Sequence, residues 1–357
     1  MNERQNLISL LRRQGYDHIP VEFNLCPHLE KVYRENTRTL KNYRSYFKMP
    51  WESVGGLIHV PADKKRFDKY HTEENLANPD FAIDGDGVGH KKTATSMHMT
   101  QMFCPLSDAD SLEQIDEYPL SVLDESKSLK ALKAAVRLTH LKGLAAVGNM
   151  QCTIWETAWY IRGMENLMMD MMCEDPMAEH LLDKVTERSL KRAVAYAKAG
   201  VDILFLGDDI GMQNSIMMSE EMYCTWLKPR LAKIISAAKA VNPNLIVFYH
   251  SCGFVTPFIP HLIDAGVDVL NPVQPECMNF EEIHEAYGDK ISFNGTIGTQ
   301  STMPFGTPAD VRREVEKNLK IAGDKGGLFV SPTHLLEPEV PWENILAYVD
   351  ACRHFCG

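Results

Sequence analysis

The sequence predicts an α/β protein folded as a (β/α)8 TIM barrel with an insertion after the second strand. Three observations support this fold class. Short apolar runs alternate with amphipathic helix patterns from Leu144 onward, these runs are continuously apolar, and no glycine-rich phosphate loop follows any of them. Continuous apolar runs are typical of parallel strands covered on both faces. We expect residues 1–357 to form a single domain, because barrels of about 250 residues or more fold as one unit.

Two strand candidates precede the regular part of the chain, HIPVEFN (18–24) and GGLIHV (55–60). A polar and turn-rich stretch follows at 61–125, in which IDGDGVGHK is typical of a hairpin turn. This stretch does not fit the strand–helix alternation. We therefore predict that it is an insertion that covers the barrel mouth as a lid.

Six strand–helix units follow the insertion. One helix opens at Ser219 with an N-cap serine and two acids, and another opens with Thr307 as its cap and Pro308 in its first position. Such units build parallel sheets through right-handed crossovers. An open doubly wound sheet is the alternative, which the lack of a glycine-rich loop disfavours. The expected strands are 144–150, 201–207, 245–250, 267–273, 291–298 and 328–334.

Composition excludes several classes of function. The net charge of -11, with acids and bases mixed along the chain, argues against a nucleic-acid or anionic-membrane surface. No apolar run reaches the roughly 18 residues that a membrane helix needs, and the N-terminus carries no secretory pattern. Nine cysteines without framework spacing indicate reduced thiols. We expect a cytoplasmic protein.

Polar side chains follow almost every expected strand. The carboxyl ends of barrel strands meet at one mouth, where barrel enzymes hold their active sites. Some of these side chains would only cap the next helix, whereas the others indicate a pocket. The candidates that we expect to line it are Glu22, Asn24, Asn149, Gln151, Asn271 and Asn294, with Trp155 as an aromatic wall.

His250 and Cys252 stand two residues apart in YHSCG, at the end of a strand, where an i, i+2 pair faces one side. His334 follows the last strand in SPTHLLEP and would complete a set of three ligands. Three ligands with one open position are typical of a catalytic zinc site. Each residue also has an alternative interpretation: Cys252 could be a buried thiol, His250 a hydrogen-bonded core histidine, and His334 a helix-capping or substrate-binding side chain. We predict a metal site, although its ligands must meet across the mouth.

Two adjacent carboxylates stand in GDDIGMQ, after another strand. Neighbouring residues on a strand point in opposite directions, so one carboxylate can face the pocket while the other supports a loop. We expect Asp209, rather than Asp208, to face the pocket. It would serve there as a fourth metal ligand, a partner for a metal-bound histidine or a proton acceptor.

Five segments carry a family resemblance that spans about 115–357. In these segments the chain resembles the uroporphyrinogen decarboxylase superfamily, which implies a (β/α)8 barrel. They are GDDIGMQNSIMMSEEMYCTWLKPR, YHSCG, DVLNPVQ, FNGTIGTQSTMPFGTPADVRREV and SPTHLLEPEVPWEN.

The resemblance leaves two chemistries open. The decarboxylases of the superfamily are metal-free and bind their tetrapyrrole with arginines near the first strand and an aspartate after the second. This chain has Glu22 and Asn24 at the first position, and His59 with no clear aspartate unless Asp63 serves at the second. An acidic strand end would repel a substrate with eight carboxylates. A histidine at the position of His334 is common to the decarboxylases as well.

The other branch comprises cobalamin-dependent methyltransferases, including O-demethylase components, which bind zinc through His-x-Cys and a later cysteine. His250 and Cys252 match the first two ligands, and His334 stands where the relatives have cysteine. The resemblance implies a zinc-dependent methyltransferase that moves an O-, N- or S-methyl group between a small substrate and a corrinoid, with Asp209 or Glu22 as a further ligand or proton handler. A shell of two histidines and one cysteine leaves a harder ion than a sulfur-rich shell does.

The partners follow from the same interpretation. We identify no cobalamin module in the sequence, so the corrinoid would come on a separate protein that docks at the barrel mouth. A homodimer is the one oligomer we consider. The alternatives are a tetrapyrrole decarboxylase of the uroporphyrinogen type and a non-catalytic barrel that binds a small ligand or a corrinoid protein.

Overall fold

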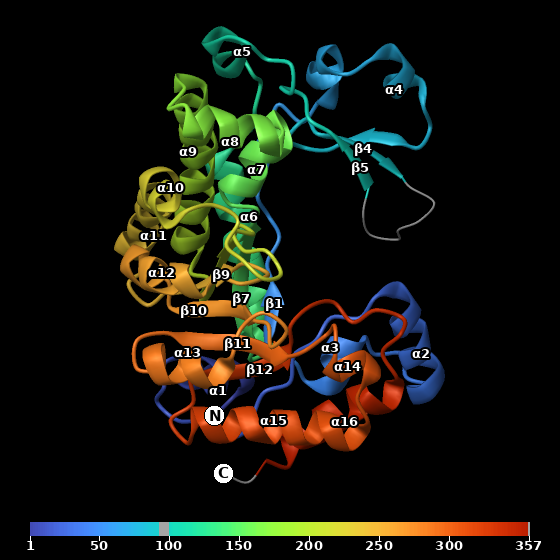
Figure 1. Ribbon diagram of the computed structural model, residues 1–357. Coiled ribbons are helices and arrows are strands. Elements are labelled where there is room, and N and C mark those ends of the chain that lie inside the picture. Colours follow the sequence, from blue (N-terminus) through green and yellow to red (C-terminus); the bar gives the residue numbers. More distant parts are fainter. Residues whose placement is uncertain (93–99, 356–357) are drawn as a thin grey trace.

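A curled parallel sheet with helices on its outer side organises the protein in the computed structural model, which describes residues 1–92 and 100–355 (Figure 1). The sheet has seven strands in the order β1-β7-β8-β9-β10-β11-β12, and every pairing in it is parallel. The predicted α/β class and its strand–helix alternation are confirmed. The strands are β1 (Trp51–Ser53), β7 (Ala145–Gln151), β8 (Ile203–Gly207), β9 (Ile246–His250), β10 (Val269–Val273), β11 (Ser292–Ile297) and β12 (Leu328–Pro332).

Helices connect successive strands, and their start signals match the sequence. Asp175 accepts from the N–H of Met177 at the start of the longest helix, and the Thr307 hydroxyl accepts from Asp310 N. The connecting helices are α6 (Glu125–Leu141), α7 (Trp155–Arg162), α8 (Met164–Met172), α9 (Pro176–Ala199), α10 (Glu220–Met222), α11 (Lys228–Val241), α12 (Ile259–Ala265), α13 (Phe280–Tyr287), α14 (Thr302–Phe305) and α15 (Pro308–Ala322), and α16 (Trp342–Arg353) follows β12. No described helix is both long enough and apolar enough to cross a membrane.

The prediction of a strand at 18–24 is wrong. The N-terminal part consists of α1 (Glu3–Leu11), an extended segment, α2 (Pro27–Thr37) and α3 (Tyr43–Phe47). Within the extended segment, Leu25 alone forms a bridge, with Leu336 beyond β12. Its apolar side chains are buried, but its backbone bonds go elsewhere: the Tyr348 hydroxyl accepts from Glu22 N and donates to Glu22 O. Hence, within the part of the chain that the structure describes, the hydrogen-bonded ladder has seven strands and does not close into the predicted eight.

The second expected strand, 55–60, is also misplaced. The strand in the main sheet is β1, which pairs with β7, and Gly55-Gly56 follows it. Gly56 has φ +137, and a Cβ there would lie 3.0 Å from Leu132 N in α6. A β-strand cannot continue through that conformation. His59–Val60 (β2) pairs antiparallel with Val122–Leu123 (β6), outside the main sheet.

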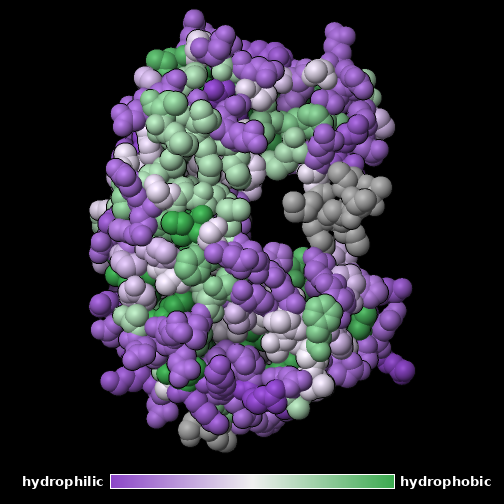
Figure 2. All heavy atoms as spheres, in the orientation of Figure 1, coloured by the Kyte–Doolittle hydropathy of each residue, from purple (hydrophilic) through white to green (hydrophobic). Residues whose placement is uncertain are grey.

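Residues 59–92 and 100–123 form an arm that projects from the upper end of the molecule (Figure 1). The predicted hairpin turn is confirmed, because Ile83 and Gly89 pair across it and Asp84 accepts from the N–H groups of Asp86 and Val88. Figure 2 shows the molecule hollowed between this arm and the part that carries α2 and α3. A lid role stays a prediction. The arm contains a 3-10 helix (Lys64–Tyr70), α4 (Glu73–Ala77), β3 (Phe81–Ile83), β4 (Gly89–Lys92), β5 (Thr100–Phe103) and α5 (Leu112–Asp116).

Tyr348 is the connection between the extended N-terminal segment and the sheet edge at β12. Its hydroxyl oxygen also lies 3.0 Å from Val330 O, so its single proton is shared between the carbonyls of Glu22 and Val330. We expect Tyr348→Phe to lower the free energy of unfolding by about 2 kcal/mol, because Glu22 N–H would be left buried without an acceptor. Urea denaturation measures this change, and Tyr46→Phe, on a 42% exposed side chain, is the matched control. Equal stability of both variants would contradict the assigned role.

Candidate functional site

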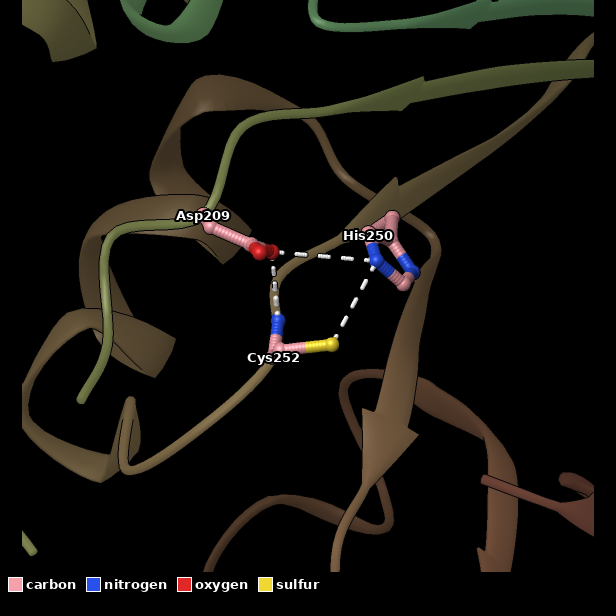
Figure 3. A group of neighbouring side chains, drawn as sticks. All are labelled: Asp209, His250 and Cys252. Carbon is pink, nitrogen blue, oxygen red and sulfur yellow. Dashed lines mark hydrogen bonds and ion pairs between the residues drawn. The ribbon is translucent and has the colours of Figure 1, made fainter. Parts of the chain in front are cut away.

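Three side chains with metal-binding atoms converge where β8 and β9 end (Figure 3). Asp209 comes from the loop after β8, His250 is the last residue of β9, and Cys252 lies two residues further on. The strands are in register so that Gly207 pairs with His250. A Cβ at Gly207 would lie 2.6 Å from the His250 Cβ, so glycine permits this close approach.

One ligand atom from each of the three residues lies within 4.8 Å of the others. His250 Nε2 is 3.6 Å from Cys252 Sγ and 3.7 Å from Asp209 Oδ1. The Cys252 N–H donates to Asp209 Oδ1 at 2.8 Å, which orients the carboxylate toward the group. Imidazole nitrogen, thiolate and carboxylate oxygen are all zinc ligands, and three of them leave one position open. The group is a candidate metal centre.

A chain of amides sets the tautomer of His250. Asn294 Nδ2 donates to the backbone carbonyl of Phe329 at 2.7 Å, which places Asn294 Oδ1 against Asn271 Nδ2 at 2.6 Å. Asn271 Oδ1 therefore faces His250 Nδ1, at 2.6 Å, and must accept its proton. The lone pair of His250 is left on Nε2, the nitrogen that faces Cys252 and Asp209. Metal-binding histidines are oriented in this way by a hydrogen bond to the other ring nitrogen.

Acidic groups gather behind the candidate metal centre. Glu156 Oε2 accepts from Asp209 N at 3.2 Å, and Glu156 Oε1 accepts from the Tyr160 hydroxyl at 2.7 Å. Burial, followed by the charge of Asp209, raises the pKa of Glu156. Burial, then Asp209 and Glu156, raises the pKa of the Cys252 thiol to about 12. A divalent cation at the site would offset this negative charge and favour the thiolate, so the donor set fits a metal.

Asp208 has a structural role at the start of α7. Its carboxylate is buried and accepts from the N–H groups of Ile154 and Glu156 at the start of α7. Burial, followed by the charge of Glu156, raises its pKa. The two adjacent aspartates thus point to different groups: Asp208 caps α7, and Asp209 faces His250 and Cys252.

A cavity of about 590 Å³ lies beside the candidate metal centre. The aromatic side chains that line it are Phe23, Tyr43, Trp51 and Phe205. Most of the side chains predicted for a pocket also line it: Glu22, Asn24, Asn149, Gln151, His250, Asn271, Asn294 and His334. The cavity therefore combines carboxamides, aromatic faces and one edge of the candidate metal centre, as small-molecule sites commonly do.

Two predicted residues lie elsewhere than expected. Trp155 is fully buried and does not line the cavity, because it begins α7 and packs into the core. His334 is exposed at the cavity rim and is not part of the candidate metal centre. It follows β12, which is three strands from β9 in the sheet order. Asp209, on the loop after the adjacent strand β8, is the third residue of the candidate metal centre instead.

Glu22 forms a buried ion pair that the sequence did not indicate. Arg44 Nη1 and Nη2 lie 2.9 and 3.0 Å from the two Glu22 oxygens, and Arg44 also contacts Asn24 Oδ1 at 3.3 Å. Burial raises the pKa of Glu22, although Arg44 opposes that shift. The predicted acidic strand end is therefore neutralised. Glu22 is also absent from the candidate metal centre.

Sequence reasoning missed Arg44 and Glu156. Arg44 lies in the short helix α3 and follows no predicted strand end, so no spacing rule connects it with Glu22. Glu156 had a local signal, because Glu156 and Tyr160 are four residues apart at the start of a helix that follows a strand end. Such a pair lies on one face of the helix.

We expect Asn271→Leu to weaken metal binding about 10- to 100-fold, because His250 would lose the acceptor that fixes its tautomer. Competition titration with a zinc chelator measures the affinity. Asn149→Leu is the matched control, since Asn149 lines the cavity without contacting His250 and should leave the affinity unchanged. Equal affinities of the two variants would show that the amide chain does not act on the metal.

Comparisons with known proteins identify the family of the chain. The family profile described as uroporphyrinogen decarboxylase (URO-D) matches residues 92–355. Methylcobamide:CoM methyltransferase MtaA of Methanosarcina barkeri is 27% identical over 173 residues, 48% of each protein. The uroporphyrinogen decarboxylase of Vesicomyosocius okutanii is 27% identical over 191 residues, 52% of this chain and 51% of that protein. In both alignments the chain spans about half the length of its relative.

Two further comparisons extend over nearly the whole chain. The uroporphyrinogen decarboxylase of Coxiella burnetii is 20% identical over 365 residues, 99% of this chain and 95% of that protein. A solved methyltransferase from Methanosarcina mazei covers 98% of both chains with a TM-score of 0.65 and 18% identity, a likeness of fold. Because the profile match covers most of the sequence, the chain belongs to the uroporphyrinogen decarboxylase (URO-D) family.

Proposed function

We propose that the protein is a zinc-dependent methyltransferase that moves a methyl group between a small methylated substrate and a corrinoid carried by a separate partner protein. The observation that carries the proposal is the group of Asp209, His250 and Cys252 beside the cavity, with the lone pair of His250 already directed at the group. The relative from Methanosarcina barkeri, whose name is methylcobamide:CoM methyltransferase, supports the same chemistry.

The three ligands would hold zinc with one position open toward the substrate. Bound zinc would supply Lewis acidity at the atom that carries or receives the methyl group. Asp209 adds an oxygen ligand where a sulfur-rich shell would hold cysteine, and Asp-His-Cys is a harder set than a shell of several thiolates. We therefore expect an oxygen- or nitrogen-linked methyl substrate rather than a thiol.

The chain's own residues would bind and orient that substrate. Phe205 and Trp51 present aromatic faces to the cavity, while Asn149 and Gln151 offer hydrogen bonds at the end of β7. Glu156, whose pKa burial raises, would hold a proton next to Asp209. The extended segment before α2 would occupy the place of the eighth strand of the barrel. The corrinoid protein would dock at the barrel mouth, near the arm.

A methyl-transfer screen tests the proposal. The purified protein is incubated with free cob(I)alamin and with methoxylated aromatics, methylamines or methyl thiols, and methylcobalamin formation is followed by absorbance. We expect transfer from at least one oxygen- or nitrogen-methyl donor, and loss of the transfer after chelation of zinc with restoration by added Zn²⁺. Transfer that is unaffected by complete zinc removal would contradict the proposal.

A tetrapyrrole decarboxylase is the second candidate, and two observations favour it: Arg44 lies at the cavity, and a decarboxylase aligns with nearly the whole chain. However, both guanidinium nitrogens of Arg44 that could bind a carboxylate already pair with Glu22. A substrate with eight carboxylates is poorly matched to this cavity. Decarboxylation of uroporphyrinogen by the metal-free protein would support this candidate over the first.

A further inference from the structure

A second cavity, of about 350 Å³, lies at the root of the arm against α9, and it shares no lining residue with the first. Its wall is strongly basic. Arg188 and Arg192 come from α9, and Lys64 and Arg66 come from the arm, whereas Asp86 is the one acid among its lining residues. His59 also lines it. Four cations around one carboxylate are an unusual wall in a chain with a net charge of -11.

The one acid of this basic cavity is already paired. Arg188 forms a two-pronged ion pair with Asp86, in which Nη2 lies 3.0 Å from Oδ2. The Arg188 side chain is 7% exposed, and its Nε is buried without a hydrogen-bond partner. Asp86 is fixed in turn, because the Tyr118 hydroxyl donates to its carbonyl at 2.6 Å. The pair therefore joins the arm to α9, and no unpaired acid remains among the lining residues.

Arg192 is the cation of this wall that has no directly paired carboxylate among the described residues, although the charge of Asp86 also acts on it. No hydrogen bond or ion pair joins its guanidinium to any residue in 1–92 or 100–355, and its Nε is buried without a partner. It stands four residues after Arg188, so the two like charges share one face of α9. Burial, followed by the charge of Arg188, lowers the pKa of Arg192. Arg192 is half-buried, and withdrawing a cation from water without an ion pair is costly unless a ligand supplies the opposite charge.

The two arm cations have their own partners, which hold them at the cavity wall. Lys64 Nζ donates to Ile83 O at 2.8 Å, and Arg66 Nε donates to Pro119 O at 3.0 Å. Both acceptors are backbone carbonyls, which satisfy hydrogen bonds but carry no charge. The positive charges of Lys64, Arg66 and Arg192 consequently remain available to an anion.

We propose that this basic cavity is a binding site for a phosphate group, either free or carried by a small ester. Guanidinium forks match the oxygens of phosphate, and a doubly charged tetrahedral anion offsets more of the positive wall than a single carboxylate would. The cavity is larger than a bare phosphate requires, which leaves room for an ester group beside Pro61 and Ala62. The site is separate from the candidate metal centre and does not depend on the methyltransferase proposal.

Isothermal titration calorimetry with inorganic phosphate tests the proposal on the full chain. We expect saturable binding that Arg192→Gln weakens about tenfold or more, the effect of losing a charge-assisted hydrogen bond. Arg192→Lys, which keeps the charge, should retain part of the affinity. Arg137→Gln, on an exposed arginine of α6, is the matched control and should bind as the native protein does. Absence of saturable binding, or equal affinity of Arg192→Gln and Arg137→Gln, would overturn the proposal.

Three further binding measurements locate and define the site. Glycerol 3-phosphate should bind more tightly than inorganic phosphate if the natural ligand is an ester, and equally if it is free phosphate. Malonate should bind more weakly than either, and malonate binding as tight as phosphate would overturn the assignment to phosphate. Cys252→Ser, which removes a candidate metal ligand, should leave phosphate affinity unchanged; loss of binding in that variant would place the anion at the metal instead.

The titration of His59 is an independent measure of anion binding, and it can be followed even in a protein variant whose fold is less stable. Burial, followed by the charges of Arg192 and Arg188, lowers its pKa. A bound anion would favour the imidazolium, so its pKa should rise when phosphate is present. Histidine NMR titration with and without phosphate, assigned by His59→Gln, measures this shift. An unchanged His59 titration at saturating phosphate would contradict binding in this cavity.

Discussion

Cys252→Ala is expected to reduce methyl transfer to cob(I)alamin by roughly 10³-fold or more. The thiolate is one of three ligands in the candidate metal centre, and a catalytic metal supplies several kcal/mol of charge stabilisation in the transition state. Initial rates at saturating donor measure the loss. The reduction should appear in kcat, because Cys252 does not line the substrate cavity.

Two controls distinguish metal loss from general damage. Cys173→Ala alters an exposed thiol at the end of α8 and should keep the native rate. His334→Ala alters the cavity rim and should keep the metal while raising KM at most. An equal loss of rate in Cys173→Ala and Cys252→Ala would remove the support for a metal role. Loss of metal in His334→Ala would restore His334 as the third ligand.

Arg44→Met is expected to lower the free energy of unfolding by about 3 kcal/mol at neutral pH. Removal of one partner from a buried ion pair leaves the other charge without compensation, and the Arg44 side chain is 30% exposed, which places the loss at the low end of the usual range. Urea denaturation measures it. The double variant Glu22→Gln with Arg44→Met should recover most of the stability, because no buried charge remains. Arg34→Met, on an exposed face of α2, is the control.

The destabilisation should depend on pH in a defined direction. Burial raises the pKa of Glu22 even with Arg44 present, and without Arg44 that pKa should rise further. A carboxyl group whose pKa is raised by folding destabilises the folded state increasingly as pH rises above its unfolded value, until the folded pKa is passed. The stability deficit of Arg44→Met should therefore shrink as pH falls toward the unfolded pKa of Glu22. A deficit that is constant across that window would assign the loss to packing instead.

The regular half of the fold was predictable from sequence because its signals are local. Each apolar run between residues 144 and 334 is short, continuous and followed by a helix start, and all six became parallel strands. The N-terminal half carried weaker signals. The segment 18–24 has a strand-like pattern, yet its backbone bonds to the Tyr348 hydroxyl, over 300 residues away in sequence. No local pattern contains that interaction.

The candidate site shows the same division. His250 and Cys252 came from spacing on one strand, and Asp209 from the alternation of side chains after β8. Strand order decides which of the remaining polar ends can meet, and sequence periodicity does not reveal it: β8 and β9 are adjacent, whereas β12 lies three strands away from β9. Asp209 consequently joins the centre in place of His334. Arg44 contacts Glu22 through the tertiary packing of α3, and no sequence motif predicts that contact.

Metal content measured on the native protein and on variants of the candidate centre tests the central claim most directly. Inductively coupled plasma mass spectrometry on the purified chain, reconstituted with Zn²⁺ and freed of excess metal, should give one zinc per chain. Asp209→Asn, His250→Ala and Cys252→Ser should each lower that value severalfold, while His334→Ala and Cys173→Ser should retain it. A native protein that binds no zinc, or zinc retained in full by Cys252→Ser, would contradict the account.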